Sequence, residues 1–143
     1  MSGEYPKLLK KRALNALKWA ERAFIDGDYD TVAREAEYAA QLYINSLIYR
    51  VLGEERVGHD IRGLLGILAA SLLENGLNKE AEFISEYIRT HRRELAELAE
   101  AHTRAVYGIF EYGEKEAKLI LKIAKEVIDK LKLLEVKLFE QED

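Results

Sequence analysis

The sequence contains no cysteine, and this absence excludes several kinds of protein at once. Disulfide scaffolds, zinc ribbons and thiol catalysis all need cysteine side chains. Long apolar runs are also missing. No stretch approaches the roughly 18 apolar residues that a membrane-spanning helix requires, and residues 1–11 lack the apolar run of a secretory leader. We therefore expect a cytoplasmic protein that does not associate with a membrane.

The sequence has a single proline, Pro6, near its start. The first turn of a helix tolerates proline, so the rest of the chain is free to be helical. Methionine, asparagine and glutamine are scarce, whereas lysine, arginine and glutamate are abundant. This bias is typical of heat-adapted proteins and predicts a thermophilic source.

What the sequence does contain is typical of a globular protein. Of its 143 residues, 48% are hydrophobic and 34% are charged, and a chain of this length can bury a core. We expect one domain over residues 1–143 that ends in an acidic tail at about 140–143. The net charge of −4 disfavours general DNA binding.

Apolar residues recur every three or four positions in five segments, which is the spacing of one helix face. The segments cover about 7–25, 29–52, 59–75, 78–108 and 114–139. Glycines separate them, and Asp28 or Asp30 and Asp60 are suited to cap helix starts. The pattern predicts an all-α protein, an up-and-down antiparallel bundle of about five helices. Nine positions should be buried: Leu17, Tyr43, Leu47, Leu68, Ile84, Leu95, Leu98, Ile120 and Leu131.

The histidines do not match a metal site. Neither the His-Glu-x-x-His motif nor the Glu-x-x-His pairs of di-iron bundles are present. His91 and His102 share one predicted face but lie about 16 Å apart along an ideal helix, too far to bind one ion. No glycine-rich phosphate loop or nucleophile elbow is found either. We expect no metal and no cofactor.

Most of the candidate functional residues lie in the segment 89–107, RTHRRELAELAEAHTRAVY. One interpretation is an electropositive cleft that binds a phosphate or an RNA backbone, with a histidine that titrates near neutral pH. The other is that the histidines bond facing helices and that the charges form ion pairs such as Arg93–Glu97. The ligand-binding candidates are His59, His91, Arg93 and Arg104. His59 can instead bond the backbone of its own loop.

Three runs of sequence resemble the HEPN domain family, named for higher eukaryotes and prokaryotes nucleotide-binding. They are GDYDTVAREAEYAAQLYINSLIYRVLG at 27–53, GHDIRGLLGIL at 58–68 and AELAEAHTRAVYG at 96–108. The resemblance implies a helical bundle that commonly pairs as a homodimer. It also implies two roles. Many members act beside a small nucleotidyltransferase, often as toxin–antitoxin pairs. Others are metal-independent ribonucleases with an Arg-x(4–6)-His signature at a dimer cleft, where the arginine holds phosphate and the histidine assists the ribose 2′-hydroxyl.

The chain departs from the ribonuclease signature. Arg104 matches its arginine, but no histidine follows Arg104. If Val106-Tyr107-Gly108 aligns with a Val-His-Gly core, Tyr107 takes the place of the histidine, and a tyrosine with an ordinary pKa near 10 is a poor base at neutral pH. The catalytic candidates are therefore His102, Arg104 and Tyr107. On an ideal helix His102 and Arg104 point about 200° apart.

We accordingly expect a non-catalytic, dimeric HEPN-like module that binds a nucleotide, RNA or a partner nucleotidyltransferase. Two alternatives stay open. One is a metal-independent ribonuclease of variant geometry, and the other is a purely structural helical dimer.

Overall fold

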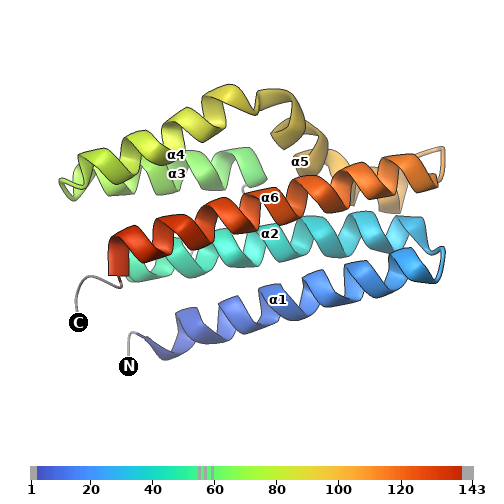
Figure 1. The fold of residues 1–143 in the computed structure, drawn as a ribbon, viewed down its shortest axis with the longest axis horizontal. Coiled ribbons are helices and arrows are strands. Elements are labelled where there is room, and N and C mark those ends of the chain that lie inside the picture. The colour runs from blue at the N-terminus through green and yellow to red at the C-terminus, as the bar shows by residue number, and fades with distance from the viewer. Residues whose placement is uncertain (1–2, 55, 57, 59, 140–143) are drawn as a thin grey trace.

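The computed structural model describes residues 3–54, 56, 58 and 60–139. This part of the chain forms six α-helices and no strand (Figure 1). The all-α prediction is confirmed, and none of the six helices combines the length and apolar character that a bilayer crossing needs. The helices are α1 (Glu4–Ile25), α2 (Tyr29–Leu52), α3 (Ile61–Glu74), α4 (Asn78–Thr90), α5 (Arg92–Tyr107) and α6 (Glu114–Phe139).

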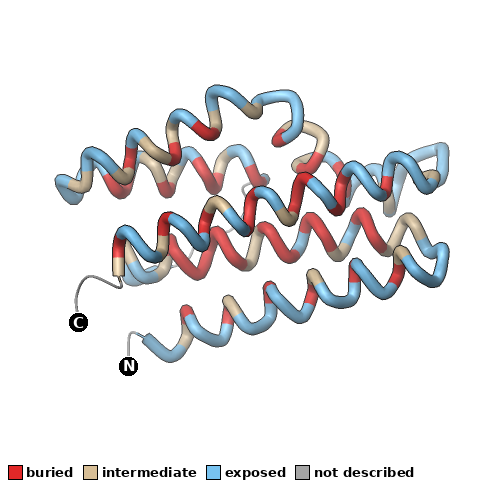
Figure 2. The backbone as a smooth tube through the Cα atoms, viewed as in Figure 1, coloured by how far each residue is buried: buried red, intermediate tan, exposed pale blue. Residues whose placement is uncertain are grey.

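Helix α2 lies at the centre of the bundle. It contacts α1, α3, α5 and α6, and buried residues follow it along most of its length (Figure 2). The antiparallel pair α3 and α4 covers one side, and α1 covers another (Figure 1). Helices α2 and α6 run in the same direction because α4 and α5 together carry the chain back before α6 begins.

The helix ends follow from the local sequence. Asp28 Oδ1 accepts a hydrogen bond from the Thr31 amide at 3.4 Å, and Asp60 Oδ1 accepts one from the Gly63 amide at 3.0 Å. These two aspartates therefore cap α2 and α3 as predicted. Gly53 ends α2 with a φ of +80°, a conformation that costs glycine little.

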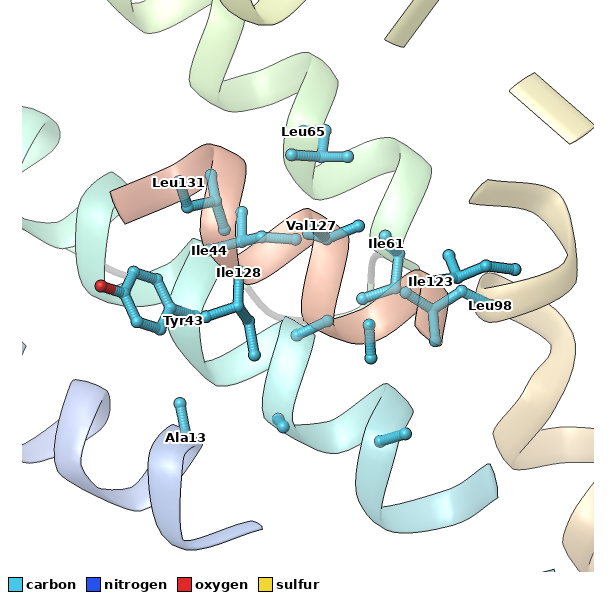
Figure 3. Close-up of a cluster of buried hydrophobic side chains, with 14 of the residues drawn as sticks. Ala13, Tyr43, Ile44, Ile61, Leu65, Leu98, Ile123, Val127, Ile128 and Leu131 are labelled. Atoms are coloured by element: carbon cyan, nitrogen blue, oxygen red, sulfur yellow. The ribbon is translucent and has the colours of Figure 1, made fainter. Parts of the chain in front are cut away.

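The core contains eight of the nine positions predicted to be buried. Figure 3 shows its centre, where Ile44, Ile61, Leu98, Val127 and Leu131 come together from four helices. The ninth position, Leu17, is half-buried and packs against the edge of the core. Its exposure follows from the contact between α1 and α2, because the innermost positions of α1 are the alanines Ala13, Ala16, Ala20 and Ala23.

One helix was predicted over residues 78–108, and the structure has two there. His91 has φ −125° and ψ 30°, so α4 ends at Thr90 and α5 begins at Arg92. The break allows α4 to pack on α3 while α5 packs on α2. It also ends the predicted continuous face from His91 to His102: His91 is half-buried at the break, and His102 is exposed on α5.

Candidate functional site

Arg104, in the last turn of α5, is held by two carboxylates of its own helix. Its guanidinium forms ion pairs with Glu97 at 3.2 Å and with Glu100 at 3.0 Å. The side chain is about half exposed, so each pair is a surface pair that contributes about 0–1 kcal/mol. An anionic ligand would have to displace these carboxylates or accept their repulsion.

A hollow of about 390 Å³ adjoins Arg104 where α5 passes into α6. Its wall continues through residues 108–112 and ends at Glu116. Two of its lining residues are large and exposed, Ile109 at 90% and Phe110 at 82%, and two more exposed apolar or aromatic residues shortly precede them in sequence. We call this group the α5–α6 apolar patch; it consists of Val106, Tyr107, Ile109 and Phe110. Soluble proteins rarely leave such a group uncovered without a binding role.

Tyr112 anchors the connection between α5 and α6. Its amide donates a hydrogen bond to Asp30 Oδ1 of α2 at 2.9 Å, and its ring packs against the core. Gly113 then donates to Glu116 Oε1 at 3.1 Å in the first turn of α6. Both contacts hold the connection at its far end, which leaves Ile109 and Phe110 displayed to solvent.

The Tyr112 hydroxyl is buried, and it has no hydrogen bond of good geometry within the described part of the chain. Burial raises its pKa, while the neighbouring Arg104 guanidinium acts in the opposite direction. Tyr112 and Arg104 both line the hollow, while the Tyr112 hydroxyl itself stays buried beside it.

His102 lies near Glu37 of α2 and not with Arg104. Glu37 is only 3% exposed, and its carboxylate accepts a hydrogen bond from Gln41. Burial raises the pKa of Glu37, the Gln41 bond and the charge of His102 lower it, and the charge of Asp60 raises it. Helix α5 is unbroken from Arg92 to Tyr107, so His102 and Arg104 of one copy of the chain point in different directions.

His91 closes the end of α4. Its ring stacks on that of Tyr87 with centroids 4.3 Å apart, and its Nδ1 lies 3.0 Å from the Tyr87 carbonyl oxygen. Because a carbonyl oxygen only accepts, Nδ1 carries the proton in this contact. His91 thus bonds its own helix, and not a facing helix as one interpretation of the sequence expected. Across the described residues, no group of three histidine or carboxylate side chains is placed to hold a metal ion.

The remaining candidates are dispersed. Arg93 is exposed at the start of α5, and the predicted Arg93–Glu97 pair is not formed, because Glu97 pairs with Arg104 instead. Tyr107 ends α5 with 79% of its surface exposed. His59 lies outside the described residues.

Two features of the site were not predicted from the sequence. Glu37 stands four residues after Ala33 and one after Ala36, on the buried alanine face of α2. A charged residue at the helical spacing of the buried alanines indicates a buried carboxylate. Ile109 and Phe110 stand between two glycines, where large apolar residues have no helix to pack with.

The model of the HEPN domain family matches residues 6–134 of the chain, from the first turn of α1 to within five residues of the end of α6. No curated protein matches the chain, and no solved structure does.

Proposed function

The chain belongs to the HEPN domain family, and we propose that it is a non-catalytic member that binds a partner protein, a small nucleotidyltransferase. The binding surface is the end of α5 together with the α5–α6 apolar patch. One observation carries the proposal: Ile109 and Phe110 stand exposed beside the Arg104 hollow.

The chemistry of this surface suits a protein better than a nucleic acid. Binding to RNA depends on cations that can neutralise phosphates. Arg104 is already paired with Glu97 and Glu100, and Glu111 and Glu116 add two carboxylates to the wall of the hollow. Exposed aromatic and aliphatic side chains beside an arginine are instead typical of the centre of a protein interface.

The hollow itself suits a side chain of the partner. Its volume of about 390 Å³ is open beside the apolar patch, and Arg104 and Tyr112 both line it. An apolar side chain with a polar end would cover the patch and bond the half-exposed Arg104 guanidinium. The nucleotidyltransferase as the partner comes from the family, in which many members act beside such an enzyme.

We propose that the chain is non-catalytic because of how α5 orients two of the candidate residues. A metal-independent ribonuclease needs its arginine and its histidine at one phosphate. His102 and Arg104 are two residues apart on a continuous helix, so their side chains diverge by about 200°.

The test is an affinity measurement by titration calorimetry between the full chain and the purified nucleotidyltransferase encoded beside its gene. Phe110→Ser should weaken binding by about tenfold or more, because a large anchor at an interface centre contributes strongly. Leu133→Ser is the matched control, since Leu133 is also exposed but lies near the other end of α6. Equal effects of the two changes, or the lack of a nucleotidyltransferase gene beside this one, would contradict the proposal.

A further inference from the structure

A second hollow lies at the other end of the long helices. Helix α1 begins there, and α2 and α6 end there (Figure 1). It consists of two adjoining parts of about 320 Å³ and 150 Å³ that share Lys10, Arg50 and Glu135. We call it the basic hollow. The larger part also contains Tyr43, Lys132, Val136 and Phe139, and the smaller part contains Gly3, Pro6, Lys7 and Ser46.

The charge of the basic hollow is strongly unbalanced. Among the described residues, four cations line it, Lys7, Lys10, Arg50 and Lys132, and Glu135 is the one carboxylate. This concentration occurs in a chain whose net charge is −4, so it does not reflect a generally basic surface.

Glu135 is already fully engaged. One of its oxygens accepts a hydrogen bond from the buried Tyr43 hydroxyl, and the other pairs with Lys10 at 3.3 Å. Its side chain is only 12% exposed. The carboxylate therefore compensates Lys10, and no other described carboxylate lining the hollow compensates Lys7, Arg50 or Lys132.

The guanidinium of Arg50 is positioned so that it can bind an oxyanion. Its guanidinium lies 3.5 Å from the centroid of the Phe139 ring. Contact with an aromatic ring fixes the group but leaves its N–H donors free to bond two oxygens at once. Arg50, Lys7 and Lys132 form no ion pair within the part of the chain that the structure describes.

From this arrangement we infer that the basic hollow binds the phosphate group of a small molecule. Arg50 bonds two phosphate oxygens, and Lys7 and Lys132 supply the remaining positive charge. The combined size lies near the lower end of the range of ligand sites, which fits a free phosphate or a small phosphate ester and not a polymer. The site is independent of the partner surface, which lies beyond the opposite ends of α2 and α6.

The test is an NMR titration of the ¹⁵N-labelled full chain with sodium phosphate, against sodium chloride at equal ionic strength. Phosphate should produce saturable shifts at amides around Lys10, Arg50 and Lys132. Arg50→Gln should raise the dissociation constant by about tenfold, because it removes a two-point, charge-assisted contact. Lys132→Gln should raise it less, and both variants should fold, since both side chains are exposed.

Arg12→Gln is the matched control, because it removes the same charge from an exposed position of α1 outside the hollow. It should leave phosphate binding within about twofold, as general attraction is screened by salt. Identical effects of Arg50→Gln and Arg12→Gln, or shifts that do not saturate, would overturn the inference.

Ribose 5-phosphate and ribose distinguish the source of the phosphate. Tighter binding of ribose 5-phosphate than of inorganic phosphate supports an ester ligand, and equal binding supports free phosphate. Shifts of the same amides by ribose alone would contradict a phosphate site.

Discussion

Tyr43 of α2 and Glu135 of α6 are 92 residues apart in sequence, yet the Tyr43 hydroxyl donates a hydrogen bond to the Glu135 carboxylate. Tyr43 is fully buried, and Glu135 also pairs with Lys10 of α1. One polar cluster thus joins the three long helices at the edge of an apolar core.

Tyr43→Phe should lower the free energy of unfolding by about 1–3 kcal/mol, because the change removes a hydrogen bond to a charged group in a mostly buried setting. Urea denaturation followed by circular dichroism measures the effect. Tyr38→Phe is the control, since Tyr38 is exposed on the same helix. A loss no larger than that of Tyr38→Phe would show that the cluster contributes nothing to stability.

The same tyrosine should make stability depend on alkaline pH. Burial raises the pKa of Tyr43 above its ordinary value of 10.0, and the hydrogen bond to Glu135 and the charge of Glu135 raise it further. Above about pH 10 the unfolded chain loses the Tyr43 proton while the folded chain keeps it, so stability should fall as pH rises. The fall in stability should be shallower in Tyr43→Phe. Equal slopes of stability against pH in the two proteins would show that Tyr43 does not cause the dependence.

Glu37→Gln should stabilise the protein at pH 7. Burial raises the pKa of Glu37, so the folded state favours the neutral form that glutamine imitates. The gain should shrink as pH falls from the raised pKa of the folded state toward the ordinary value of 4.5, because below 4.5 the wild-type side chain is protonated in both states. Thermal unfolding between pH 4 and 7 tests this, with Glu35→Gln as the less buried control on the same helix. A gain that is independent of pH would contradict the explanation.

Leu47→Ala and Leu98→Ala should each cost about 2–5 kcal/mol, since both side chains are fully buried and alanine leaves a cavity. Leu133→Ala removes the same atoms from an exposed position of α6 and should cost far less. Chemical denaturation of the three variants compares them directly. Similar losses of stability in all three variants would contradict the burial of Leu47 and Leu98 in the core.

We predict that the chain forms a homodimer, as HEPN domains commonly do. Exposed apolar residues on the outer helices, such as Trp19 and Ile25 of α1 and Leu119 of α6, are consistent with a further contact surface. Light scattering over a dilution series should give about twice the chain mass of 16.4 kDa. A monomer at micromolar concentration would refute the prediction.

Incubation with mixed-sequence RNA in EDTA separates the binding module from the ribonuclease alternative. The wild-type chain should not cleave the RNA, because His102 and Arg104 diverge on α5. Cleavage that falls about 100-fold or more in His102→Ala would establish the histidine as an acid–base group and overturn the non-catalytic proposal. Tyr107→Phe tests the third catalytic candidate in the same assay.

Much of the fold could be predicted because helix formation is governed by neighbours in sequence. The caps at Asp28 and Asp60 and the stop at Gly53 each depend on a few adjacent residues. The buried faces followed from a spacing of three and four. The family resemblance noted in the sequence runs is likewise confirmed by the match over residues 6–134.

The candidate site was less predictable, because several possible partners lie within reach of each of its side chains. Glu97 was expected to pair with Arg93 but pairs with Arg104, which is also within reach on one helix face. The bond from the Tyr112 amide to Asp30 joins residues 82 positions apart. No local pattern encodes such a contact, since it arises only when α2 and α6 pack.

The sequence by itself determined that the chain is helical, where most helices begin and end, and which face of each is buried. The tertiary structure alone decided the break at His91, because one straight helix cannot pack on α3 and on α2 together. It also decided that Ile109 and Phe110 stay exposed and that Lys7, Arg50 and Lys132 share one hollow. Helix formation depends on residues within a turn or two of each other, whereas surfaces and sites depend on how distant helices come together.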